Sequence, residues 1–188
     1  MNCPNCGAPM TLAAEHDSFR CEYCLTVHVP QPDLDGVRSL ADPAGLHCPV
    51  CQHELVAAAL DGHRVVHCPN CKGILFQQGL FGLLVRYLRT RTAEVPAPPR
   101  PFARAELDRR LLCPSCGRPM DTHPYAGPGN VAIDLCAPCA LVWLDYSELN
   151  RILTAPGRDR DRPLKNLFDE EAEADKPPHP KRRWRWEL

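Results

Sequence analysis

Short apolar runs, closed by turn-forming residues, recur along the chain. Runs of this kind predict β-strands. The clearest pair, 54–60 and 63–67, is joined by Asp61-Gly62, a dipeptide typical of tight hairpins. The predicted strands fall into three groups: 10–12, 19–20 and 26–29; 54–60, 63–67 and 74–76; and 131–135 followed by the apolar segment 141–144.

Three segments predict helices instead. Residues 80–88 carry an apolar stripe wider than one small hairpin needs, so this helix either caps its own unit or contacts another unit or subunit. Residues 102–112 predict a short amphipathic helix. Asp145 and Glu148 have the spacing of a capping box, which predicts a helix over 146–153.

Cysteine pairs bracket each group of predicted strands. All 12 cysteines fall into CxxC pairs, and consecutive pairs combine into three units with the spacing of a four-cysteine zinc site. We therefore predict three zinc ions, each bound by four thiolates. The three ligand sets are Cys3, Cys6, Cys21 and Cys24; Cys48, Cys51, Cys68 and Cys71; and Cys113, Cys116, Cys136 and Cys139.

The fold class that follows is a small, metal-stapled β protein with three tandem three-stranded units and short helices after the second and third. We expect units at 1–30, 47–91 and 112–154, each folding on its own metal. Between them we expect a polar linker at 31–46 and a Pro-rich spacer with a short helix at 92–111. Residues 155–188 are expected to be a disordered tail with a basic, aromatic end.

Composition agrees with metal-stapled units. Aromatic residues make up only 6% of the chain, too few for one large core. The sequence shows no signal peptide and no apolar run long enough to span a membrane. A cytoplasmic protein with reduced thiols is the expectation, and a disulfide-bonded secreted scaffold is the alternative.

Charge argues against a general nucleic-acid binder. The formal net charge is −1, and three Zn²⁺ with twelve thiolates lower it to about −7. Residues 1–45 hold two arginines against six acidic residues, or about −6 with their site loaded. Residues 46–91 are the most basic unit, at about +1 when loaded.

The third unit resembles the TFIIB-type zinc-ribbon family. The segment that carries the likeness is Cys136-Ala137-Pro138-Cys139, followed by Trp143-Leu144-Asp145 and Glu148-Leu149. It departs from the family at Leu141 and Ser147, where glycines are usual, and at the displaced Pro138. The second unit has Gly73 and Gly79 at the glycine positions but Leu75 at the tryptophan position. The resemblance implies a zinc-bound three-stranded ribbon followed by a helix.

Three classes of function remain open. A non-catalytic adaptor or scaffold that docks on protein, with transcription machinery as one target, fits the tandem units and stiff spacers. A nucleic-acid-binding ribbon is the alternative. A rubredoxin-like iron protein or a thiol chaperone is the third, although a closed four-cysteine site leaves no open coordination position for catalysis. No small-molecule substrate or catalytic residue is predicted.

Two segments are candidate partner surfaces. Trp184, Arg185 and Trp186 alternate aromatic and cationic side chains, as interface hot spots do. The helix at 80–88 offers Leu80, Leu84 and Tyr87. We expect His53, His63 and His67 to be exposed residues rather than surplus ligands.

Overall fold

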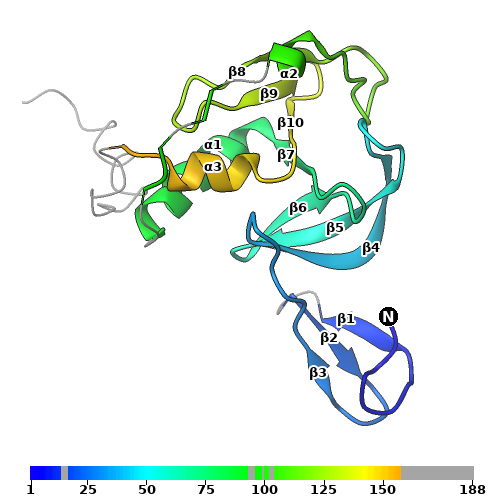
Figure 1. Ribbon diagram of the computed structural model, residues 1–188. Coiled ribbons are helices and arrows are strands. Elements are labelled where there is room, and N and C mark those ends of the chain that lie inside the picture. Colours follow the sequence, from blue (N-terminus) through cyan, green and yellow to red (C-terminus); the bar gives the residue numbers. More distant parts are fainter. Residues whose placement is uncertain (14–16, 93–95, 99, 102–103, 158–188) are drawn as a thin grey trace, which may run out of the picture.

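The computed structural model describes residues 1–13, 17–92, 96–98, 100–101 and 104–157. The first ribbon is a separate three-stranded sheet, and the other two ribbons share one seven-stranded sheet (Figure 1). The smaller sheet has the order β1-β2-β3, from Met10–Ala13, Ser18–Cys21 and Val27–His28. The larger has the order β4-β5-β6-β7-β10-β9-β8, from Val37–His47, Glu54–Leu60, His63–His67, Ile74–Gln77, Leu141–Leu144, Ala132–Cys136 and Asp121–Pro124.

The last strands of ribbons 2 and 3 pair with each other. Strands β7 and β10 are antiparallel, with Leu75 opposite Trp143, and each of these residues is the fourth after the last cysteine of its site. Because equivalent positions face each other, a pseudo-two-fold axis through this pair relates the two strands, as in a symmetric dimer. The expectation of separately folded second and third units is therefore wrong: they form a double ribbon.

Two helices cover one face of the shared sheet. α1 (Gln78–Arg91) follows β7, and α3 (Glu148–Thr154) follows β10; the two lie side by side against the sheet (Figure 1). They close a single core drawn from both ribbons, whose members are Val37, Ala58, Leu60, Val65, Ile74, Phe76, Phe81, Leu84, Val85, Val131, Ile133, Val142, Leu144, Leu149 and Ile152. The wide apolar stripe of the helix at 80–88 is thus explained by an inter-ribbon contact within one chain.

Arg89 ties the two helices together. Its side chain is fully buried, and its guanidinium donates to the backbone carbonyl of Ile152 in the last turn of α3. A cation at a helix C-terminus satisfies free carbonyls and interacts favourably with the helix dipole. The remaining short helix, α2 (Arg104–Asp108), packs beside β8.

Residues 37–46, expected to be part of a linker, belong to the edge strand β4, which ends at His47. It pairs with β5 and is interrupted by two register shifts, which contain the positive-φ residues Ala41 and Gly45, while Pro43 lies between the two shifts, opposite Val56. An edge strand tolerates proline because one side of its backbone needs no partner. The linker-like composition of this segment therefore hid a strand.

Asp35, just before β4, caps a helix more than a hundred residues away. Its two carboxylate oxygens accept hydrogen bonds of 2.7 Å from the backbone N–H groups of Ser147 and Asn150 at the start of α3. Burial raises the pKa of Asp35 above its usual value, although these two N–H groups act in the opposite direction. Nearby, the buried His67 lies 3.3 Å from Asp33, so the expectation of an exposed His67 is wrong.

The predicted capping box forms only in part. Glu148 accepts a hydrogen bond of 2.8 Å from the backbone N–H of Asp145, but the Asp145 side chain points elsewhere and α3 begins at Glu148. The residue before the helix, Ser147, has a positive φ of 73° and makes no side-chain cap. Asp35 supplies the missing cap.

Ribbon 1 rests on the edge of the double ribbon. Leu40 of β4 and Ala59 of β5 are buried in the core of ribbon 1, next to Phe19. An ion pair of 2.8 Å between Asp17 and Arg64 joins the same two bodies. Ribbon 1 therefore has a defined contact with the sheet.

We predict that Asp35→Ala lowers the free energy of unfolding of the double ribbon by about 1–2 kcal/mol, because two N–H groups at a buried helix end lose their acceptor. Denaturant unfolding at fixed free zinc, followed by circular dichroism, measures the change. Asp42→Ala is the matched control, since Asp42 lies in the same segment and is exposed. Equal stability of the two variants would contradict the capping role.

Candidate metal centres

Each CxxC pair lies in a tight turn that turns its two sulfurs to one side. The residue after the second cysteine has a positive φ in all six turns, and these residues are Gly7, Leu25, Gln52, Lys72, Gly117 and Ala140. In five of the six, its N–H donates to the carbonyl of the first cysteine at 2.8–3.0 Å. Glycine adopts this conformation without strain, and the other residues are held in it by the closed turn.

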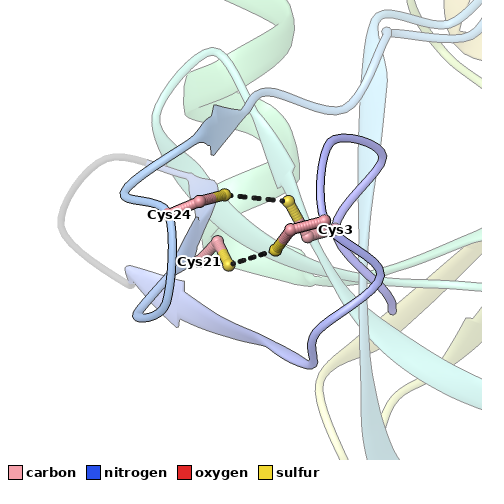
Figure 2. A group of neighbouring side chains, drawn as sticks. Cys3, Cys21 and Cys24 are labelled. Atoms are coloured by element: carbon pink, nitrogen blue, oxygen red, sulfur yellow. Dashed lines mark hydrogen bonds between the residues drawn. The ribbon is translucent and has the colours of Figure 1, made fainter.

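The sulfurs of each set lie at zinc-binding distances. All four ligand atoms of a set lie within 4.8 Å of one another, and the contacts between facing turns measure 3.4–3.7 Å. Figure 2 shows Cys3, Cys21 and Cys24 of the first set converging between their two turns. A tetrahedron with Zn–S bonds of about 2.3 Å has edges of about 3.8 Å, whereas a disulfide is about 2.05 Å long. The three predicted sets are confirmed and fit three zinc ions.

The thiols of a set do not titrate alike. In the second set the pKa of Cys51 is lowered to about 5: burial raises it, but hydrogen bonds from Asn70, from the His53 backbone and from neighbouring thiols prevail. The pKa of Cys48 is raised to about 11, chiefly by burial. In the absence of metal, one thiol of the cluster therefore loses its proton readily, whereas deprotonating all four thiols together is unfavourable. A dication would replace these protons and stabilise all four thiolates.

Trp143 lies between the second and third metal centres. It is fully buried in a cluster that includes ligand cysteines of both sets. Its ring also fills the space next to Gly73, where an added Cβ would lie only 2.1 Å from the indole. Gly73 belongs to ribbon 2 and Trp143 to ribbon 3, so the ring packs across the boundary between them. One side chain thus links both metal centres.

A polar network orients this tryptophan. The indole N–H donates to Asp145 at 3.0 Å, and Arg109 bridges Asp145 to the fully buried Asp134. Thr122 of β8 also donates to Asp134, at 2.5 Å. The charge of Asp145 beside Arg109 is a principal reason why the pKa of this guanidinium is raised, although burial opposes it. Asp145 therefore holds Trp143 in place instead of capping α3.

Residues 47–86 and 112–155 both match the family model described as a transcription factor zinc-finger, the TFIIB-type zinc ribbon. Ribbons 2 and 3 are therefore each similar to the TFIIB-type zinc-ribbon family. No curated protein and no solved structure matches the chain.

The family motif has a structural explanation here. In ribbon 3, Trp143 fills the space between the metal centres, Asp145 accepts a hydrogen bond from its indole, and Glu148 closes the turn before α3. In ribbon 2, Leu75 stands at the tryptophan position and lies directly opposite Trp143.

The candidate partner residues on α1 differ in how far they are buried. Leu84 is buried in the core of the double ribbon, so it offers no free surface, while Leu80 and Tyr87 are partly buried. The other candidates, Trp184, Arg185 and Trp186, lie outside the described residues.

An exposed apolar strip on ribbon 1 was missed. It runs along the second turn and β3, and its members are Tyr23, Leu25, Val27 and Val29. The signal was present in the sequence, because Pro30 ends the apolar run and no helix follows to cover it. Among the described residues, no helix is both long and apolar enough to cross a membrane.

We predict that Cys136→Ser unfolds ribbons 2 and 3 together, because losing one structural zinc removes about 10–16 kcal/mol from a unit with one shared core. Amide NMR spectra should lose the dispersed signals of both ribbons while those of residues 1–29 persist. The matched control is Cys21→Ser, the equivalent cysteine of ribbon 1, which should unfold only residues 1–29. Retention of a folded ribbon 2 in Cys136→Ser would contradict the shared core.

Proposed function

We propose that this chain is a zinc-dependent, non-catalytic docking module that binds protein through ribbon 1. In this proposal, ribbons 2 and 3 form the double ribbon on which ribbon 1 rests. The cytoplasm, where thiols stay reduced, is the compartment we expect.

The observation that carries the proposal is the exposure of β3. Counted from the last cysteine of each ribbon, Val27 is equivalent to Ile74 and Val142, and Val29 is equivalent to Phe76 and Leu144. Val27 is 60% exposed and Val29 45%, whereas all four equivalents are at most 1% exposed. In the double ribbon these positions are covered by partner strand and helices. In ribbon 1 nothing among the described residues covers them.

The adjacent turn extends this surface. Tyr23 is 84% exposed and Leu25 61%, and both lie in the second cysteine turn, just before β3. Aromatic and aliphatic side chains held on a rigid, metal-closed turn lose little conformational freedom on binding. We call Tyr23, Leu25, Val27 and Val29 the docking strip.

Nucleic-acid binding is less well supported. The basic residues of the most basic unit are engaged within the protein, among them Arg64 with Asp17, Lys72 with the Pro69 carbonyl, Arg89 with α3, and Arg91 with Asp61. A phosphate-binding face needs basic side chains that are free to reach the backbone. The docking strip, by contrast, is uncharged.

The class of partner follows from the family. Two of the three ribbons match a family model whose description is transcription factor zinc-finger. Components of the transcription machinery are therefore the partners to test first. In this account the cysteines act only as ligands, since each belongs to a four-thiolate set without an open position.

We predict that replacing Val27 and Val29 by aspartate abolishes partner capture without changing the fold, because both side chains are exposed. The measurement is affinity capture from a lysate of the source cells, followed by reconstitution with the purified candidate and titration. Leu83→Asp is the matched control, since Leu83 is 54% exposed on α1 and far from the strip in sequence. Capture that survives the double substitution, or a partner that proves to be nucleic acid with steep salt dependence, would contradict the proposal.

A further inference from the structure

We propose that the docking strip is made for an extended segment with aromatic residues at alternate positions and arginines between them, and that residues 181–188 of this chain occupy it in cis when no partner is bound. The inference deepens the proposed function and rests on it.

The first support is the open backbone edge of β3. The N–H of Cys21 donates to the Thr26 carbonyl at 2.9 Å, and Phe19 is paired with His28, so Thr26 and His28 turn their backbone groups towards β2. In an antiparallel sheet alternate residues face opposite neighbours. Val27 and Val29 therefore turn theirs outwards, on the edge that no described strand occupies.

The double ribbon provides the internal precedent. Ile74 and Phe76 occupy the same outward positions in ribbon 2, and there they pair with Leu144 and Val142 of an antiparallel strand. The outer edge of the last strand is thus a pairing edge in this ribbon. Adding a strand to an exposed edge is a common mode of peptide recognition.

Side-chain spacing selects the segment. Val27 of β3 and Val29, the residue just after β3, are two positions apart, the spacing that puts side chains on one face of an extended chain, and Trp184 and Trp186 have the same spacing. In an antiparallel pairing, each indole would lie opposite one valine, and aromatic–β-branched pairs are among the favourable cross-strand contacts.

Charge complementarity also favours residues 181–188 as the occupant. Residues 181–188 carry four basic residues and one acidic residue, a net of +3. Residues 1–30 hold one arginine against three acidic residues, or about −4 with their site loaded, and the exposed Glu22 lies beside the strip. Opposite charges of this size favour encounter and fix orientation more than they add affinity.

The connecting chain is long enough. Residues 158–180 separate the last described residue from the segment and could span up to about 75 Å if fully extended. A compact body of this size has a radius of gyration of only about 15 Å. Tethering at this length places the segment near its site at an effective concentration of about millimolar.

The experiment uses the zinc-loaded chain lacking residues 181–188 and a labelled synthetic peptide of that sequence, with binding followed by fluorescence anisotropy. We expect saturable binding that is lost with Val27→Asp, retained with Leu83→Asp, and lost when both peptide tryptophans are replaced by alanine. The intact chain should bind the same peptide at least about tenfold more weakly, because its own segment competes.

Each outcome decides between the claims. No binding to the shortened chain, or binding unchanged by Val27→Asp, overturns the inference while leaving partner capture through the strip to its own test. Equal affinity of the intact and shortened chains overturns occupancy in cis. A doubling of mass that requires residues 181–188, seen by sedimentation, would assign the occupant to a second copy and likewise overturn it.

Discussion

The antiparallel pairing of β7 with β10 is the interaction on which most of this molecule depends. It joins two ribbons that each lack enough apolar surface for a core, and it brings Leu75 opposite Trp143 between two metal centres. Once the strands are paired, the helices that follow them fall on the same face and close the shared core. Gly73 is part of the same constraint, because the indole ring occupies the space a side chain would need.

The relative contributions of zinc binding and of the hydrophobic core to stability differ between ribbon 1 and the double ribbon. A structural zinc supplies about 10–16 kcal/mol, enough to hold a ribbon with very few buried residues. The double ribbon adds the core around Phe76 and Phe81, whereas ribbon 1 adds only a small cluster with Phe19 and the contact to Leu40. Ribbon 1 can therefore leave its last strand uncovered. The last strands of the double ribbon are thus used for its own core, whereas the last strand of ribbon 1 stays exposed.

Local features of the fold could be predicted from the sequence. The twelve ligands follow from spacing, the hairpin from Asp61-Gly62, and the helix after ribbon 2 from its apolar periodicity. What could not be predicted depends on contacts between distant segments. The pairing of β7 with β10 requires knowing which edges are left open, and Asp35 finds its helix end only after the sheet has formed. Strand β4 was missed because Pro43 and Gly45 suit a linker as well as a bulged edge strand.

The most direct test of the double ribbon is native mass spectrometry of zinc loss during stepwise chelation. The chain should bind three zinc ions when fully loaded, and a variant with Cys3→Ser and Cys6→Ser should bind two. Because the two remaining sites share one core around Trp143, the variant should pass from the two-zinc form to the zinc-free form without a populated intermediate. A one-zinc species that dominates at half loading would show independent sites and contradict the account.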